Sequence, residues 1–557
     1  MALGRSVYDA MPRHPFRPPP ELRGASAVRH PVAILGAGPV GLTLAAGLAQ
    51  HGIPCVVVEP RDAVGFGSRA ICISRRSLEI LEGFGAAAEI LRTGLPWTGG
   101  RSWWREHPVL EFAMPSDADQ RHPPMLNLQQ CFTEQCLVDA LAARPEVELR
   151  WRSEMRALHQ EADGVRLRIG TPEGEYDLAA DWVVATDGAR SPTRAALGLR
   201  LEGTSYEGRY LIADIRLRSR RPTERLAWFD PLSNPGSTLL MHRQPHDIWR
   251  IDYQLRDDED AEAAQREENV RARIAAHLAA IGEGPEYELV LVSLYRAHCL
   301  TLDRYRHGRV LLAGDAAHLV PIFGVRGMNS GIEDAGNLAW KLAAVVRGEG
   351  GDGLLESYSE ERVLAARENI RNARKSTLFM TPPSRGHALM RDAALSLAAA
   401  GQEFARALVN PRQSTASSFP ESRLQTPEQG EWSAGPPPGA VLPSVPVVLP
   451  GGGGTGHAQM LVGPAPTVLL AAGDPAAESH LLAARPGLRL VRIGPGGEAE
   501  DRWGRAAALL GLDRPGAGYL LRPDGHVAWR WRRFDPAGLG AALARLLARG
   551  DSGRAER

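Results

Sequence analysis

GRVLLAGDAAHLVPIFGVRGMNSGIEDAGNLAWK, residues 308–341, combines a strand, a loop rich in glycine and a helix. The apolar run Arg309–Ala313 has the length of a buried strand. Asp315 then follows at the carboxyl end of that strand, where open α/β sheets bind their ligands. The pattern Ser330–Glu333 is that of a capping box and predicts a helix beginning at Ser330, which Gly348 would end.

This arrangement predicts a site for a ligand that is both a polyol and an anion. The Asp315 carboxylate can accept hydrogen bonds from hydroxyl groups, and a helix N-terminus favours a negative charge beside it. A reduced flavin is such an anion, and its ribityl chain is such a polyol. The alternative is an ordinary strand–loop–helix connection in which Asp315 has no ligand.

A second motif lies near the N-terminus, from Pro31 to Pro60. Val32–Leu35 is a predicted strand, GAGPVG follows directly at Gly36, Gly38 and Gly41, and a second strand ends in Glu59. Strand, glycine motif, helix and an acidic residue about 20 positions on together make the dinucleotide fingerprint. In this fingerprint Gly36 permits the tight turn, Gly38 permits the close approach of a pyrophosphate, and Gly41 permits close packing of the helix on the strand. Glu59 would accept hydrogen bonds from ribose hydroxyls.

Composition excludes several classes of protein. The 557 residues hold 65 Lys+Arg and 65 Asp+Glu, so no net charge recruits nucleic acid or an anionic membrane. Five cysteines without CxxC or zinc spacing favour a reducing, cytoplasmic compartment and no metal site. No apolar run approaches the ~18 residues of a membrane span. Residues 1–30 lack the apolar core of a signal peptide and are expected to be a loose leader.

The remaining segments predict three domains. Residues 31–205 and 295–410 would form a discontinuous Rossmann-like domain with a helical C-terminal part, and residues 206–294 an inserted β-sheet domain. Residues 411–450 are rich in Pro, Ser and Gly and are predicted to be a linker. Residues 451–549 alternate strand and helix signals and suit a thioredoxin-like α/β domain, which has no cysteine for dithiol chemistry.

Together the motifs resemble those of the class A flavoprotein monooxygenases, the aromatic hydroxylases related to para-hydroxybenzoate hydroxylase. The resemblance rests on Gly36–Gly41 with Glu59, on Asp187-Gly188, and on Gly314-Asp315 with the loop to Asn329. The tail is similar to that of the longer subgroup, which includes phenol, 3-(3-hydroxyphenyl)propionate and aromatic-polyketide hydroxylases. One departure is GVRG at Gly324–Gly327, where many members have GGQG.

The resemblance implies which residues bind cofactors. Arg69 and Gln130 would contact the middle of FAD, Asp315 the ribityl hydroxyls, and the backbone of Gly327, Met328 and Asn329 the isoalloxazine. The Asp187-Gly188 motif with Arg190 is associated in the family with both FAD and the nicotinamide cofactor. His242 and Tyr253, on strand-like segments of the inserted sheet, and Pro321 are candidates for residues near the substrate.

The implied reaction is hydroxylation of a phenolic or other activated ring. NADH or NADPH reduces FAD, O₂ is captured as a C4a-hydroperoxyflavin, and oxygen passes to the small aromatic substrate. A homodimer is an assembly that the resemblance allows. The alternatives are another flavin oxidoreductase on the same fold and a non-catalytic escort protein built on it; intact glycines, Glu59 and Asp315 argue against the latter.

Overall fold

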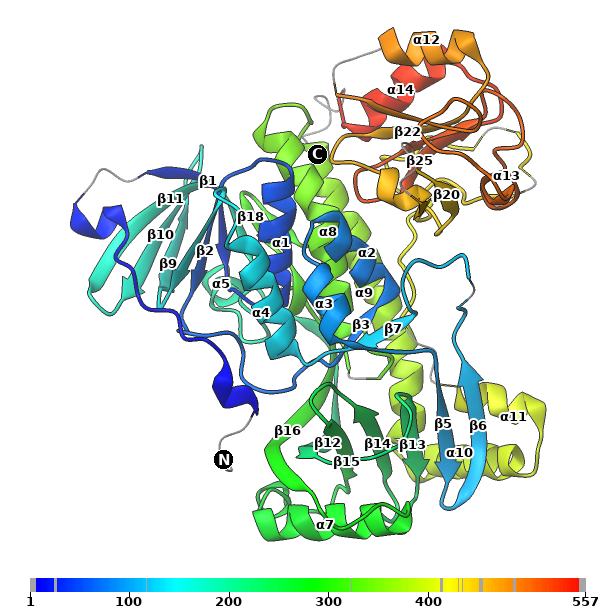
Figure 1. Ribbon diagram of the computed structural model, residues 1–557. Helices are drawn as coiled ribbons and strands as arrows, with labels where there is room; N and C mark the ends of the chain where they lie inside the picture. The colour runs from blue at the N-terminus through cyan, green and yellow to red at the C-terminus, as the bar shows by residue number, and fades with distance from the viewer. Residues whose placement is uncertain are drawn as a thin grey trace.

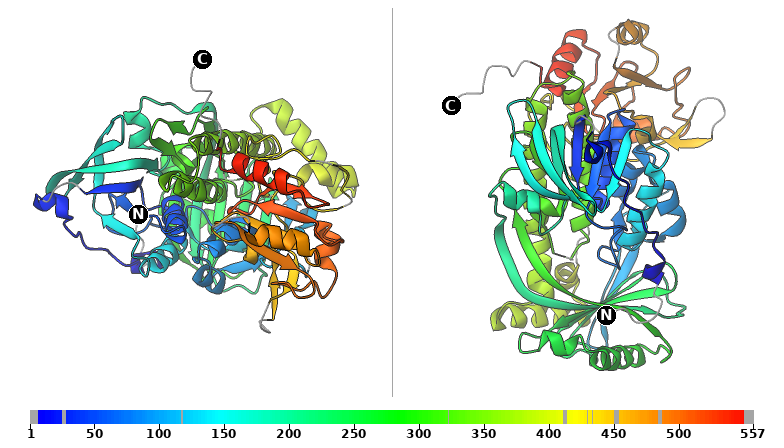
Figure 2. Two further views of the ribbon diagram at one scale, coloured as in Figure 1. Left: turned by 90° about the horizontal axis from the view of Figure 1, so that it is seen from above. Right: turned by 90° about the vertical axis from the view of Figure 1, so that its left-hand side faces the viewer.

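The computed structural model describes residues 7–24, 28–116, 118–321, 323–410, 414–428, 430–432, 434–449, 454–483 and 487–549. These residues form a central α/β domain, a second sheet on one side of it and a C-terminal α/β domain on the other (Figures 1 and 2). The predicted fold class is therefore confirmed.

The central domain is built on a mainly parallel sheet with helices on one face and an antiparallel meander on the other (Figure 1). Along the sheet the order is β17 (Arg306–His307), β18 (Val310–Leu312), β11 (Gly174–Ala185), β1 (Arg29–Leu35), β2 (Cys55–Glu59) and β8 (Val147–Trp151), with β10 (Val165–Thr171) and β9 (Glu154–Gln160) continuing from β11. Its helices are α1 (Pro39–Gln50), α2 (Arg75–Gly83), α3 (Ala88–Thr93), α4 (Gln130–Leu141), α5 (Pro192–Ala196), α8 (Gly327–Val346) and α9 (Gly353–Met380). A small sheet of β3 (Cys72–Ser74), β7 (Met125–Asn127) and β4 (Leu95–Trp97) adjoins them.

The register of the parallel strands gathers the three sequence motifs at one edge. Leu35 of β1 pairs with Ala185 of β11, and Ala185 pairs with Leu312 of β18. The residues after these positions begin the glycine motif, the Asp187-Gly188 turn and the Asp315 turn. Because all three strands are parallel, these turns leave the sheet side by side.

The second sheet is larger than residues 206–294. Its order is β19 (His318–Leu319), β16 (Glu288–Thr301), β12 (Glu202–Arg216), β15 (Ile248–Leu255), β14 (Thr238–Arg243), β13 (Arg225–Phe229), β5 (Gly99–Trp104) and β6 (His107–Ala113). Helices α6 (Ala261–Ala264) and α7 (Glu267–Ala280) cover its outer face, and α10 (Arg385–Ala399) and α11 (Glu403–Val409) lie beside β5 and β6 (Figure 1). The hairpin β5–β6 was not expected because it joins this sheet from a distant part of the sequence.

The C-terminal domain has the strand order of a thioredoxin-like fold. β22 (Thr467–Ala471) and β23 (Arg489–Ile493) are parallel, while β24 (Gly518–Leu521) is antiparallel to β22 and β25 (Val527–Trp531) to β24. The described part of this domain also contains β20 (Pro446–Val448), β21 (Thr455–His457), a 3₁₀ helix (Ala458–Leu461), α12 (Pro475–Ala483), α13 (Arg505–Leu510) and α14 (Pro536–Leu546).

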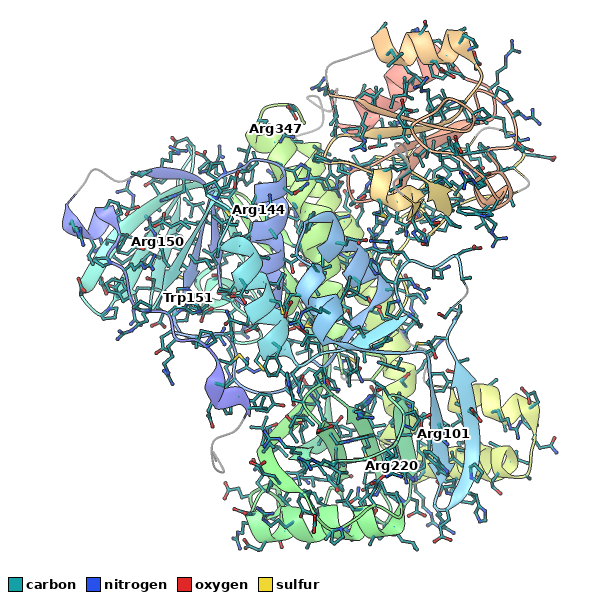
Figure 3. All side chains as sticks on the ribbon, in the orientation of Figure 1. Arg101, Arg144, Arg150, Trp151, Arg220 and Arg347 are labelled. Carbon is teal, nitrogen blue, oxygen red and sulfur yellow. The ribbon has the colours of Figure 1, made fainter. Side chains whose placement is uncertain are left out.

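The N-terminal segment 7–24 is not the loose leader that the sequence suggests. It carries two 3₁₀ turns, Val7–Ala10 and Pro20–Arg23, and runs along the central domain toward the second sheet (Figure 1). The His14 ring stacks on Trp151 at the end of β8, with 4.3 Å between ring centroids, and Glu21 pairs with Arg150. Trp151 and Arg150 are labelled in Figure 3. Aromatic and buried polar contacts fix this strap, and the polar composition of the segment gave no sign of them.

Candidate active site

The glycine motif connects β1 to α1. Each of its three glycines is required for a different physical reason. Gly36 has φ +105°, and a Cβ there would lie 2.7 Å from the Thr186 carbonyl oxygen. A Cβ on Gly41 would lie 2.1 Å from the Gly36 carbonyl oxygen, so the protein's own packing requires glycine at both. A Cβ on Gly38 would meet nothing within 4 Å. The space in front of Gly38 therefore fits a ligand's close approach at the N-terminus of α1.

Glu59 ends β2 and is buried beside this motif. One carboxylate oxygen accepts from the Ala37 N–H at 2.8 Å, and the other accepts from the backbone and side chain of Arg61 at 3.1 and 2.7 Å. Each carboxylate oxygen has two lone pairs, so these bonds leave room for a further donor. In this structure Glu59 thus holds the glycine loop in its conformation.

Asp315 combines two properties that suit a ligand-binding carboxylate. It is exposed to solvent, yet protein surrounds it closely enough that desolvation raises its pKa, with Arg69 among the cations acting in the opposite direction. In the described part of the chain its carboxylate has no hydrogen-bond or ion-pair partner. A solvent-exposed acceptor without a described protein partner fits the ribityl hydroxyls of a flavin.

The turn that carries Asp315 is held by a buried network that the sequence reasoning missed. Asp334 of α8 accepts from the Gly314 N–H at 2.9 Å, from the Arg362 Nε at 2.6 Å, and lies 2.7 Å from the His318 Nε2. Desolvation acts against the charge, but His318 and Arg362 prevail and lower the pKa of Asp334 to about 2. An ionised Asp334 fixes the turn while Asp315 stays unpaired.

The Asp187-Gly188 motif forms the turn between β11 and α5. Asp187 Oδ2 accepts from the Thr193 N–H at 2.9 Å and from the Thr193 hydroxyl at 2.7 Å, whereas its buried Oδ1 has no partner among the described groups. Arg190 is exposed. Arg194, which was not predicted, joins this turn to the Asp315 turn by donating to the Ala316 carbonyl at 3.0 Å and to the Ala189 carbonyl at 2.6 Å.

Helix α8 begins at Gly327 and not at Ser330. The Ser330 hydroxyl accepts from Asn369 of α9, and Glu333 accepts from Ser417 and Arg362, so these residues do not form the predicted capping box. Their partners come from α9 and the linker, which a local pattern cannot reveal. Gly327, Met328 and Asn329 make up the first turn, whose N–H groups have no acceptor within the helix.

Two neighbouring residues show how the start of α8 is held. The Asn329 side chain is buried and bonds to the backbone of Ser74 at 2.9 Å and of Cys72 at 3.1 Å. At Gly327 a Cβ would meet only the Val320 carbonyl oxygen, at 3.9 Å, so the space above the helix end is open. Pro321 is buried in the preceding loop, and Arg326, the departure from GGQG, donates to Asn369 at 2.7 Å.

Gln130, the first residue of α4, braces the loop that carries Arg69. Gln130 Oε1 accepts from the Ala70 N–H at 3.2 Å, and its Nε2 donates to Glu134 at 2.7 Å. Arg250 of the second sheet donates to the Ser68 and Arg69 carbonyls at 2.7 and 2.6 Å. The Arg69 side chain is exposed, and its charge acts on the Asp315 carboxyl group. The loop is therefore held from both domains.

His242 and Tyr253 lie on opposite faces of the second sheet. Tyr253 is fully buried in the apolar core between the sheet and α7, so it does not face the central domain, contrary to its selection as a candidate. His242 faces the central domain and lies next to the Trp97 ring. Every residue of β15 is buried, so burial alone could not tell which face Tyr253 would take.

The basicity of His242 limits its chemistry. Burial, with Arg225 and Arg250 nearby, lowers the pKa of His242 to about 3. A phenol has a pKa of about 10 in water, and the lowered pKa of His242 makes this imidazole a poor acceptor for its proton. His242 is therefore suited to hydrogen bonding, and a general-base role is disfavoured.

The described residues hold no group of three or more His, Cys, Asp or Glu side chains placed to bind a metal ion. Among the helices that the structure describes, none is long and apolar enough to cross a bilayer.

Comparison with known proteins agrees with this geometry. Residues 29–373 match the family described as FAD binding domain, and residues 435–550 match the family described as Aromatic-ring hydroxylase, C-terminal. A 3-(3-hydroxy-phenyl)propionate/3-hydroxycinnamic acid hydroxylase of Mycolicibacterium smegmatis is 32% identical over 369 residues, which cover 65% of this chain and 63% of that protein. The enzyme of the same description from Burkholderia cenocepacia is 34% identical over 66% of this chain and 67% of its own length.

Solved structures extend the similarity to nearly the whole chain. The flavin-dependent monooxygenase PieE, in complex with FAD and substrate, is 25% identical with a TM-score of 0.79, covering 94% of this chain and all of that one. The anhydrotetracycline hydroxylase OxyS from Streptomyces rimosus is 27% identical with a TM-score of 0.68, covering 93% and 99%.

Proposed function

Because the chain belongs to the FAD-binding domain family of aromatic-ring hydroxylases, we propose that it is an FAD-dependent monooxygenase consuming NADH or NADPH. Its substrate is a small phenolic or otherwise activated aromatic compound, with O₂ as co-substrate. The observation that carries the proposal is Asp315, a carboxylate free of protein partners among the described residues, at the carboxyl end of a parallel strand.

The residues that hold FAD in this proposal come from the three turns at the sheet edge, the end of β2, the loop of Arg69, the start of α4 and the first turn of α8. Gly36, Gly38 and Gly41 accommodate the pyrophosphate, Glu59 accepts from the adenosine ribose, and the backbone of Gly327, Met328 and Asn329 faces the isoalloxazine. Arg69, Gln130 and Asp315 contact the middle of the cofactor, and Asp187, Gly188 and Arg190 serve the cofactor and the nicotinamide reductant. When bound, FAD supplies electron transfer from NAD(P)H and the activation of O₂.

The protein's own part is to orient the cofactor and to shield the reacting groups from water. Asp334 fixes the Asp315 turn, and Arg250 fixes the loop of Arg69 against the second sheet. The first turn of α8 presents N–H groups and the positive end of a helix dipole, which favours an anionic reduced flavin. His242 offers a hydrogen bond near the substrate.

The proposal also includes a cytoplasmic location of the protein and its assembly as a homodimer. An odd, sparse set of cysteines suits a reducing cytoplasmic compartment. A homodimer stays a prediction, as do the boundaries of the three domains.

The test is substrate-stimulated oxidation of NADH and NADPH by the purified yellow protein, across a panel of phenols. We expect at least one phenol to accelerate oxidation and to yield a hydroxylated product that incorporates oxygen from ¹⁸O₂. A protein that binds FAD and is reduced, yet responds to no aromatic compound, would point to another flavin oxidoreductase.

A further inference from the structure

The N-terminal strap, residues 7–24, follows one segment of the central domain. That segment, residues 60–71, connects Glu59 at the end of β2 to the start of β3, and it contains Arg69. All of its residues are described, and none of them lies in a helix or strand. In the proposed site it extends from the acceptor for the adenosine ribose to the residue at the middle of FAD. A cofactor-site segment of this kind takes its conformation from contacts with other parts of the protein.

The first contact of the strap lies near the proposed adenosine end. The His14 N–H donates to the Asp62 carbonyl at 2.6 Å, and the Arg13 guanidinium pairs with the Asp62 carboxylate at 2.8 Å. The His14 ring stacks on Trp151, which pairs in register with Glu59 across β8 and β2. The strap is therefore attached beside the carboxylate that the proposed function assigns to the ribose.

The second contact lies near Arg69. The Tyr8 side chain is buried, and its ring packs edge-on against Phe66 with 6.0 Å between ring centroids. The Tyr8 hydroxyl donates to Asp214 at 2.6 Å, and the Ser68 hydroxyl donates to the same carboxylate oxygen. Tyr8 thereby holds the two residues Phe66 and Ser68 that precede Arg69 in the chain.

The composition of the strap suits a segment that stays in place. Prolines occupy five of the nine positions from Pro12 to Pro20. Proline fixes φ, so a proline-rich segment loses less conformational freedom when it is held. Met11, between the two contacts, packs against the apolar core of the central domain. The contacts at Tyr8 and His14 are thus joined by a short, packed stretch of chain and should open together.

We propose that the strap is a clasp that slows the exchange of FAD, because the cofactor enters or leaves when residues 60–71 move outward and the strap releases them. This inference rests on the FAD site of the proposed function and assigns the strap a role in it. The contacts at Tyr8 and His14 join protein to protein, so they oppose entry and exit of the cofactor alike. A clasp therefore slows both rates and leaves the affinity for FAD nearly unchanged.

The test measures FAD exchange by the full-length protein without reductant or substrate. Release is the loss of radiolabelled FAD from the holoprotein during a chase with excess unlabelled FAD, and uptake is the quenching of flavin fluorescence by the apoprotein. In Tyr8→Phe both rate constants should rise about 5- to 100-fold, the range for losing a hydrogen bond to a buried carboxylate. In His14→Ala both should rise about two- to tenfold, the range for losing an aromatic contact. In both variants the dissociation constant should stay within about threefold of the parent.

Tyr519→Phe is the matched control. Tyr519 is also buried, and its hydroxyl donates to the Leu510 carbonyl within the C-terminal domain, so this variant should exchange FAD at the parental rates. Parental release in both strap variants overturns the proposal, as does an equal acceleration in the control. Faster release with unchanged uptake also contradicts it, because that pattern means that the strap shapes the FAD site and does not close it.

These outcomes are separate from those that test the proposed function. FAD exchange needs neither NAD(P)H nor O₂ nor an aromatic compound. A protein that exchanges FAD as expected but hydroxylates nothing contradicts the proposed function alone. A hydroxylase whose FAD exchange is insensitive to both strap substitutions contradicts only this inference.

Discussion

Asp315 differs from Asp334 and Glu59, two other acids near the proposed cofactor site, in the partners of its carboxylate. Asp334 and Glu59 are engaged by backbone N–H groups and arginines, whereas the Asp315 carboxylate is exposed to solvent and has no partner among the described residues. The surrounding protein raises the pKa of Asp315, which disfavours the charged form until donors arrive. Hydroxyl groups of a bound polyol would supply those donors.

Asp315→Ala should therefore weaken FAD binding without unfolding the protein. Losing a charged acceptor costs about 1.5–3 kcal/mol, which is about tenfold to 150-fold in affinity. The dissociation constant can be measured by fluorescence titration of the apoprotein with FAD. Asp163→Ala is the control, since Asp163 is an exposed acid paired with Arg29. An Asp315→Ala protein with parental FAD affinity would remove Asp315 from the cofactor site.

Among the elements, the N-terminal strap of residues 7–24 is anchored by a buried hydrogen bond. The Tyr8 hydroxyl donates to Asp214 at 2.6 Å, and the same carboxylate oxygen accepts from Ser68 of the cofactor loop. Both Tyr8 and Asp214 are buried, and burial raises the pKa of Asp214 to about 6. Tyr8 therefore joins the strap, the second sheet and the loop that carries Arg69.

Tyr8→Phe should loosen the strap while keeping its apolar packing. Loss of a donor to a buried carboxylate costs about 1–3 kcal/mol, so residues 7–24 should exchange amide hydrogens and be cleaved by protease sooner. Arg13→Ala provides a comparison, because the exposed Arg13–Asp62 pair is worth at most about 1 kcal/mol. Equal protection of the strap in Tyr8→Phe and the parent would show that the hydroxyl contributes little.

At the scale of the whole molecule, the C-terminal domain docks through buried charges. Arg522 donates to both oxygens of Glu361 of α9, at 2.8 and 3.0 Å, and Lys341 of α8 lies 2.8 Å from the same carboxylate. Asp524 accepts from the Trp340 indole at 3.1 Å. The domain thus rests on α8, the helix that begins at the proposed flavin site, and is not a detached appendage.

This interface should make stability fall at acid pH. Despite desolvation, Arg522 lowers the pKa of Glu361 and of Asp524, which lie below the ordinary values of about 4. Carboxylates with lowered pKa values stabilise the fold above the unfolded pKa and lose that contribution as pH falls through the folded one. The melting temperature of the holoprotein, followed by calorimetry, should thus change little from pH 8 to about 5 and decline steadily below about 4.

Arg522→Met sharpens this expectation. Removing one partner of a buried ion pair costs about 3–5 kcal/mol, and without the cation the two acids should protonate at a higher pH. The decline in melting temperature should then begin nearer neutrality than in the parent. Arg423→Met is the control, because Arg423 pairs with Glu360 at the surface of the same helix. Superimposable pH profiles for Arg522→Met and the parent would argue against the network's role in docking.

The sequence alone determined the features that depend on short stretches of chain. Gly36 is required for its positive φ, and Gly41 is required for close packing. Glu59 and Asp315 are recognised because each lies at the end of a predicted strand. Each of these features can be identified within a stretch of about thirty residues. Alternating and helical patterns likewise indicated the two α/β domains and the inserted sheet. Family resemblance added the cofactor, because its motifs lie inside those same stretches.

The tertiary structure decided every contact between distant segments. Tyr8 and Asp214 are separated by 206 positions, and Arg522 and Glu361 by 161, distances over which no local pattern carries information. The register of the second sheet turned Tyr253 toward α7 and placed Arg225 beside His242. Since side chains on a strand alternate between two faces, a single residue of register decides which of them can reach a substrate. That choice is made by the packing of the whole molecule.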